Sequence, residues 1–212
     1  MTGKISRKRM LAVALAATLL SACVPANYSS TRFYVLTPLN PSAALMKEGD
    51  RKDALSVEIL SIRLPQYLER PQIVTRSATN RLELAENQQW GGNLGKDMVR
   101  TLAQNLSRIL GTPRVAMAPH RPPAPPSVCV EVEVMQFERD PKGQVRLTAQ
   151  WRLSRGGDRE LLAAQITELT GRETHAESDF ESTVTSMSAL WGELSKIIGG
   201  AILEHMKKTP DS

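Results

Sequence analysis

The chain has 212 residues and a formal net charge of +5, and this length suits one domain with a sizeable hydrophobic core. Four of its 27 basic side chains lie within the first nine residues. The other basic side chains form no dense stripe for phosphate contacts, so we expect no nucleic acid partner.

The first 22 residues have the layout of a bacterial export signal. Four basic residues and no acid precede an apolar run, Met10–Leu20, whose 11 residues fall short of the roughly 20 that a membrane span needs. Leu20-Ser21-Ala22-Cys23 follows and resembles the lipobox of bacterial lipoproteins. We therefore expect cleavage after Ala22 and a lipid on Cys23. The alternative is an ordinary signal peptide that has a cysteine at its end by chance.

Removal of this leader leaves a mature chain that is nearly neutral. The mature chain keeps 23 basic and 22 acidic side chains, a net charge of +1. With Cys23 lipidated, Cys129 is the only thiol left, so the domain must rely on packing instead of disulfides. We expect a signal peptide over 1–22, a lipidated tether over 23–30 and one domain over 31–209, held close to the bilayer. Val24 is not the acid that usually retains lipoproteins in the inner membrane, which favours the outer membrane.

The first half of the domain is predicted to hold short strands and then one helix. Strands are predicted at 32–37 and 55–64, and a hairpin-like pair at 72–76 and 81–85. The alternation in 55–64 changes phase near Ile59, which predicts a bulge there or burial on both faces. From about Gln88 to Leu110, apolar residues recur every four positions, starting at Trp90, and Gly111 supplies a stop. This period predicts an amphipathic helix that lies on a sheet.

The second half has the clearest strand pattern. Alternating valines run from Val128 to Val134, Asp140–Gly143 makes a turn, and the alternation returns from Val145 to Leu153. A third strand is predicted over about 160–170, which completes an antiparallel meander. A long helix is predicted over 179–208, with Ser178 as its cap and a Gly199-Gly200 pair that either bends it or lets another backbone approach closely. The fold class is therefore α+β, a mixed, mainly antiparallel β-sheet with two principal α-helices packed on it.

No group of residues has the spacing of a catalytic or metal site. His120, His175 and His205 are far apart in sequence, and Glu131 and Glu133 fall on the polar side of their strand. The glycines at 91–95 lack the Lys-Ser/Thr ending of a phosphate loop, and Cys129 is expected to be a half-buried strand cysteine. We expect no enzyme activity, no metal and no cofactor.

The most informative stretch is 64–94. It reads Leu64-Pro65-Gln66-Tyr67-Leu68-Glu69-Arg70-Pro71-Gln72-Ile73-Val74-Thr75-Arg76, followed by Asn80, Leu82, Leu84 and, shortly before Leu94, Trp90. It resembles the signature of the Pqi-type (PqiC/YmbA-type) ABC-transport auxiliary lipoprotein family, in which the tryptophan opens a helix. The early strand at 33–36, the strand at 57–59 and the long C-terminal helix also match. Gly91-Gly92 departs from that family, where a bulkier or acidic pair is more usual.

The resemblance implies an accessory role in ABC/MCE-type, Pqi-like lipid transport between membranes. Such a lipoprotein docks the periplasm-spanning MCE-domain (PqiB-like) protein at the outer membrane and often self-associates into a ring. The candidate partner-binding residues are those that match the motif: Pro65, Tyr67, Leu68, Arg70, Gln72 and Trp90. The other interpretation is that Pro65 shapes a turn and that Tyr67, Leu68 and Trp90 fill the core, which leaves Arg70 and Gln72 for a surface. The alternative function is a structural envelope-assembly or stress lipoprotein.

Overall fold

The structure is a computed structural model that describes residues 30–40, 55–117 and 124–208. All the elements below belong to one unit of the chain, residues 31–212. The expected signal peptide and the lipid-bearing Cys23 lie outside the described residues. Within the described part, no helix is both long enough and apolar enough to cross a membrane.

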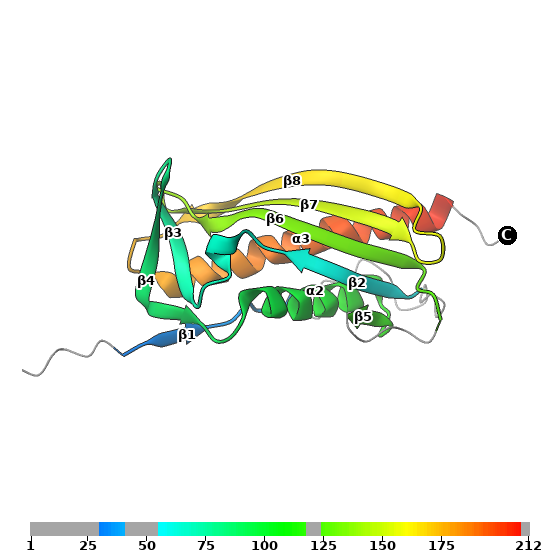
Figure 1. The fold of residues 1–212 in the computed structure, drawn as a ribbon, viewed down its shortest axis with the longest axis horizontal. Helices are drawn as coiled ribbons and strands as arrows, with labels where there is room; N and C mark the ends of the chain where they lie inside the picture. Colours follow the sequence, from blue (N-terminus) through cyan, green and yellow to red (C-terminus); the bar gives the residue numbers. More distant parts are fainter. Residues whose placement is uncertain (1–29, 41–54, 118–123, 209–212) are drawn as a thin grey trace, which may run out of the picture. The chain divides into compact units, whose positions relative to one another are not determined.

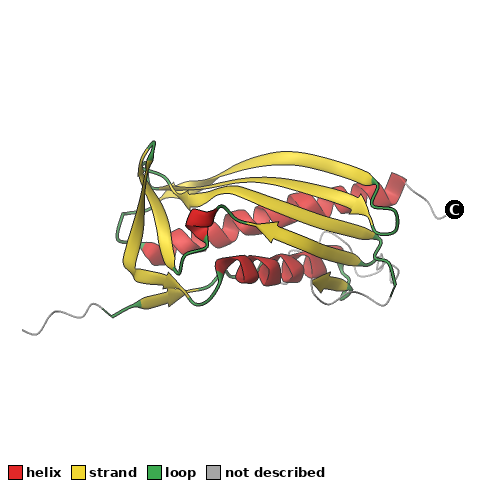
Figure 2. Ribbon diagram, in the orientation of Figure 1, coloured by secondary structure: helices red, strands yellow, loops and turns green. Residues whose placement is uncertain are grey.

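Among the described residues, eight strands form one mixed sheet, with three helical segments (Figures 1 and 2). The strands are β1 (Arg32–Tyr34), β2 (Val57–Arg63), β3 (Gln72–Ala78), β4 (Arg81–Trp90), β5 (Val115–Met117), β6 (Val128–Arg139), β7 (Gln144–Arg155) and β8 (Leu161–Thr174). The helices are the single 3-10 turn η3 (Gln66–Leu68), α2 (Leu94–Leu110) and α3 (Phe180–Lys208). These elements confirm the predicted α+β class.

The central strand of the sheet is β6. One edge of β6 pairs with β7, which pairs with β8, and all three strands are antiparallel, as the alternation predicted. The other edge pairs in parallel with β2 over Val128–Glu133 and then meets β3 only at its last residue, where Arg139 lies opposite Thr75. Two branches therefore start from this edge, with β5 beyond β2, and β4 and β1 beyond β3.

The predicted irregularity in β2 is confirmed. Its register against β6 shifts between Ile59 and Ser61, and Val57, Glu58 and Ile59 are all buried. Burial of successive residues means that both faces of this part of the strand are covered, so strict alternation is not required there.

The helices meet the sheet around a buried tryptophan. α3 packs on β6, β7 and β8, whereas α2 packs on β2 and β5 and against α3. Trp191 of α3 is fully buried, its indole N–H donates to the carbonyl of Met98 in α2 at 3.2 Å, and its ring centroid lies 6.4 Å from that of Phe137 in β6. The side chain of Trp191 thus connects α3 both to α2 and to the central strand, β6.

The predicted start of the first helix is wrong. Gln88–Trp90 belong to β4, because β1 pairs with them in parallel, with Tyr34 opposite Trp90. The helix begins at Leu94, where the side chain of Asn93 accepts from the N–H of Lys96 at 2.9 Å. Strand pairing with a distant segment therefore outweighs the local helical period.

The predicted cap of the second helix is also wrong by one residue. The backbone N–H of Ser182 donates to Oδ1 of Asp179 at 3.0 Å, so Asp179 caps α3 in place of Ser178. The hydrogen bonds to the Asp179 carboxylate, first that of the Ser182 backbone, hold the pKa of Asp179 below its usual value. An ionised carboxylate also suits the positive end of a helix dipole.

The glycine pair of α3 lets the two helices approach closely. A Cβ placed on Gly199 would lie 2.6 Å from Cγ2 of Ile109 in α2, whereas a Cβ on Gly200 would meet nothing within 4 Å. A close approach is therefore present at this pair, but the approaching atoms belong to the Ile109 side chain and not to a backbone as predicted, and Gly199 is the residue that permits it.

These two glycines allow a matched stability test. Gly200→Ala should stabilise the protein by about 1 kcal/mol, because alanine is the better helix former. Gly199→Ala gains the same propensity but overpacks the helix contact, so it should be about 1–3 kcal/mol less stable than Gly200→Ala. Urea unfolding measures both variants, and equal stabilities would contradict the close contact.

Candidate functional site

The motif residues fold over the end of β6. Pro65 is extended, with φ −65° and ψ 145°, and its carbonyl accepts from the N–H of Leu68 at 2.9 Å, which closes the single turn of η3. Leu68 is buried in the core, and the chain then enters β3 at Gln72. The structure thus places Pro65 at a turn and Leu68 in the interior.

A fully buried carboxylate lies beneath this turn. Glu138 of β6 accepts from the Tyr67 hydroxyl at 2.7 Å, from Nε of Arg76 at 2.9 Å and from Nε2 of Gln136 at 3.0 Å. Nη2 of Arg76 lies 2.7 Å from the same carboxylate, and the backbone N–H of Phe137 donates to it at 3.0 Å. We call Glu138, Tyr67, Arg76 and Gln136 the Glu138 cluster.

The pKa shifts in the Glu138 cluster favour a permanent contact between Glu138 and its donors. Burial, followed by the hydrogen bond to Glu138, raises the pKa of Tyr67 well above its ordinary value, so the phenol keeps its proton and donates. The hydrogen bond to Glu138 also raises the pKa of Arg76, which keeps the guanidinium charged. Because both carboxylate oxygens already accept hydrogen bonds, the cluster is arranged to hold η3 and β3 on β6 and not to move protons.

Trp90 joins the motif to the first strand. Its side chain is buried, its backbone N–H donates to the carbonyl of Pro71 at 2.7 Å, and the next N–H, of Gly91, donates to the carbonyl of Tyr34 at 2.7 Å. The structure therefore places Trp90 inside the domain, between the motif and β1. Its indole ring is not available to a partner in this arrangement.

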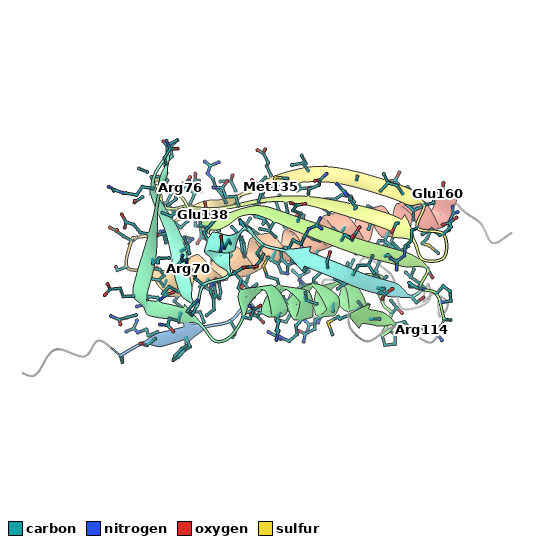
Figure 3. The ribbon with its side chains drawn as sticks, in the orientation of Figure 1. Arg70, Arg76, Arg114, Met135, Glu138 and Glu160 are labelled. Carbon is teal, nitrogen blue, oxygen red and sulfur yellow. The ribbon has the colours of Figure 1, made fainter. Side chains whose placement is uncertain are left out.

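Arg70 and Gln72 are the motif residues that were expected at a surface. Arg70 is exposed (Figure 3 labels it), and among the described residues it forms no ion pair. Gln72 is half-buried and pairs with Gln89 in the β3–β4 hairpin. Of the six candidate residues, Arg70 is the charged one and the one that is exposed.

A second buried charge, which the sequence did not predict, lies on the residue after Glu138. Arg139 donates to the carbonyls of Ala176 and Glu177, each at 2.8 Å, and to the hydroxyl of Thr183 at 3.2 Å. Its guanidinium carbon also lies 5.3 Å from the ring centroid of Phe180. Burial lowers the pKa of Arg139, and these contacts hold the loop before α3 against the sheet. No local pattern marks Glu138 or Arg139, since both break the alternation of β6.

The described part of the chain holds no cluster of side chains suited to a metal ion. No three His, Cys, Asp or Glu residues there are placed to hold a metal ion. Glu131 and Glu133 lie on the open side of β6, and His120 falls outside the described residues. Cys129 is fully buried and not half-buried as predicted; it lies in the sheet between Glu58 of β2 and Ser154 of β7, and burial raises the pKa of its thiol.

The Glu138 cluster leads to a test on two tyrosines. Tyr67→Phe leaves a buried carboxylate short of a donor and should lower the free energy of unfolding by about 1–3 kcal/mol. Tyr34→Phe removes a hydroxyl that donates at 2.7 Å to the neutral, half-buried side chain of Gln88, and should cost only about 0.5–1.5 kcal/mol. Urea unfolding compares the two, and a smaller loss for Tyr67→Phe would contradict the structural role of the cluster.

Comparison with known proteins gives one family and several similar folds. The model of a family described as ABC-type transport auxiliary lipoprotein component matches residues 34–199. No curated protein matches the chain. Protein XCC0632 from Xanthomonas campestris has a similar structure, with a TM-score of 0.68 and 11% identity over 84% of this chain and 98% of that one. The crystal structure of an uncharacterized protein is similar too, with a TM-score of 0.66 and 18% identity over 82% of this chain and 99% of that one. At these identities the structures show a shared fold and nothing further.

Proposed function

The chain belongs to the family of ABC-type transport auxiliary lipoproteins, and from this membership we propose that it serves a Pqi-like, ABC/MCE-type system for lipid transport between membranes. In this proposal it is anchored by Cys23 to the periplasmic face of the outer membrane, where it docks the periplasm-spanning MCE-domain protein. The observation that carries the proposal is the family match, which spans residues 34–199. The family is described as a transport component and not as an enzyme family.

The interior of the domain supports a docking role. The donors of the Glu138 cluster and of Arg139 are engaged by groups from several elements, which favours one fixed shape. A preformed surface binds a partner without the cost of ordering itself first. The guanidinium of Arg70 is exposed and forms no ion pair with the residues that the structure describes, so it is the motif group best placed to contact an acidic partner surface.

Self-association into a ring is a further part of the proposal. In the described sheet β8 runs from Leu161 to Thr174 and has β7 as its strand neighbour, which leaves its outer edge open. An open edge of this length offers unpaired backbone groups to another chain. This edge supports self-association but does not identify the number of copies.

The lipid anchor can be tested by fractionation of cells that express the full chain. Cys23→Ala removes the thiol that would carry the lipid, so the protein should move from the membrane fraction to the soluble fraction. Cys129→Ala is the matched control and should stay in membranes, because Cys129 is buried in the domain. Membrane retention of Cys23→Ala would refute the lipid anchor.

The docking surface can be tested by co-purification in detergent with the MCE-domain protein encoded beside this chain. Arg70→Glu should weaken capture roughly ten-fold, which corresponds to about 1.4 kcal/mol at a binding surface. Arg114→Glu, the same change at an exposed position just before β5, far from Arg70 in Figure 3, should leave capture unchanged.

Each outcome of the co-purification bears on one part of the proposal. Failure of the unmodified protein to capture the MCE-domain protein would refute docking altogether. Equal capture by Arg70→Glu and by the unmodified protein would exclude Arg70 from the interface. An unrelated gene neighbourhood, without ABC or MCE genes, would favour the alternative of a structural envelope lipoprotein.

A further inference from the structure

Two apolar side chains project from the first strand of the domain. Phe33 is 66% exposed and Val35 is 56% exposed, whereas Tyr34 and Leu36 between and beyond them are buried. This alternation gives β1 one face on the core and one apolar face in solvent. Phe33 and Val35 are also close in sequence to the proposed lipid tether. The other exposed large apolar side chains of the described residues lie on other strands: Leu84, Met135, Leu161 and Ile166.

A hollow with basic side chains at its rim adjoins Val35. It encloses about 320 Å³ and lies between the end of β1 and the first turns of α2, with Trp90 and Leu94 among its lining residues. Lys96 and Arg100 also line it, and both are exposed. Their spacing of four residues places them on one side of α2.

The local charge is positive. Asp97 is the acid among the lining residues of this hollow, and its carboxylate already accepts from the N–H of Leu36 at 2.7 Å and from Arg100. Arg32, also exposed, adds a further positive charge at the start of β1. The apolar side chains therefore stand among more cations than anions.

Two glycines next to Val35 add no side chains to the surface around it. A Cβ on Gly91 would lie 3.1 Å from Cγ1 of Val35, so the absence of a side chain there allows Val35 to sit directly on the turn. Gly92 is exposed, and a Cβ there would meet nothing within 4 Å. Neither glycine places a side chain over Val35.

The length of the tether limits what this surface can reach. Eight residues, 24–31, separate Cys23 from the start of β1. At no more than about 3.6 Å per residue they span at most about 29 Å. A lipid on Cys23 therefore keeps β1 within a short distance of the bilayer at all times, at a high effective concentration.

We propose that Phe33 and Val35 insert into the interface of the anionic phospholipid bilayer that holds the anchor, while Arg32, Lys96 and Arg100 contact its phosphates. The combination of apolar side chains with flanking cations is what an anionic lipid surface binds. This contact would fix the orientation of the domain on the membrane, which the tether by itself cannot do. The inference rests on the proposed lipid anchor.

The test uses the full-length, lipidated protein, purified from membranes and reconstituted into vesicles of phosphatidylethanolamine and phosphatidylglycerol. Phe33→Cys or Val35→Cys is labelled with an environment-sensitive dye, and labelling is selective because lipid occupies Cys23 and Cys129 is fully buried. Leu161→Cys is the matched control, since Leu161 is 61% exposed and lies at the start of β8, beside Glu160, which Figure 3 labels at the end of the sheet away from β1.

The expected result is specific to position and to lipid. In vesicles, the dye at 33 and 35 should shift to shorter wavelength, gain intensity several-fold and be quenched by lipids that carry a quencher on the acyl chain. The dye at 161 should not change. Omission of phosphatidylglycerol should reduce the effect at 33 and 35, because the basic side chains then lose their anionic partners.

Failure of this inference and failure of the anchor give different results. If the labelled protein floats with the vesicles but the dye at 33 behaves like the dye at 161, membrane insertion is refuted and the anchor stands. A shift at 33 that appears only on addition of the MCE-domain protein also refutes insertion, and assigns β1 to a protein partner. If the protein does not float with vesicles at all, the anchor is refuted, and the inference with it.

Discussion

A buried carboxylate sets the main constraint on this domain. Glu138 is fully excluded from solvent, and a charge in that position is tolerated only when enough donors surround it. Those donors come from separate elements, with Tyr67 from η3, Arg76 from β3 and Gln136 from β6 itself. The motif that carries the family resemblance is therefore bound to the central strand through one side chain, and removal of a donor would leave a buried charge uncompensated.

Arg139, the residue after Glu138, is a second buried charge that needs partners. Its guanidinium donates to the carbonyls of Ala176 and Glu177, just before α3 begins. Two consecutive charged residues thus connect the end of β6 to the motif and to the long helix. Because each charge is held by groups that are distant in sequence, the arrangement favours one rigid conformation, which suits a positioning role better than a catalytic one.

The two proposed surfaces lie near each other in the fold. The backbone N–H of Trp90 donates to the carbonyl of Pro71 and that of Gly91 to the carbonyl of Tyr34, so the turn that carries Arg70 and the strand that carries Phe33 are joined through two successive residues. A partner bound at Arg70 would therefore meet the domain close to the face that we assign to the membrane. In a lipid transport system, this places the docked partner beside the bilayer that receives or supplies the lipid.

The amino-acid sequence by itself determined the export signal pattern, the meander of β6, β7 and β8, both helices and the bulge in β2, because each depends on the order of neighbouring residues. The tertiary structure decided what depends on distant residues. Trp90 lies in a strand and not in a helix because β1 pairs with it, and Tyr67 became a donor to a buried charge 71 residues away. Local periodicity carries no information about such pairings, since the free energy of a buried charge or a strand edge depends on which remote groups come to satisfy it.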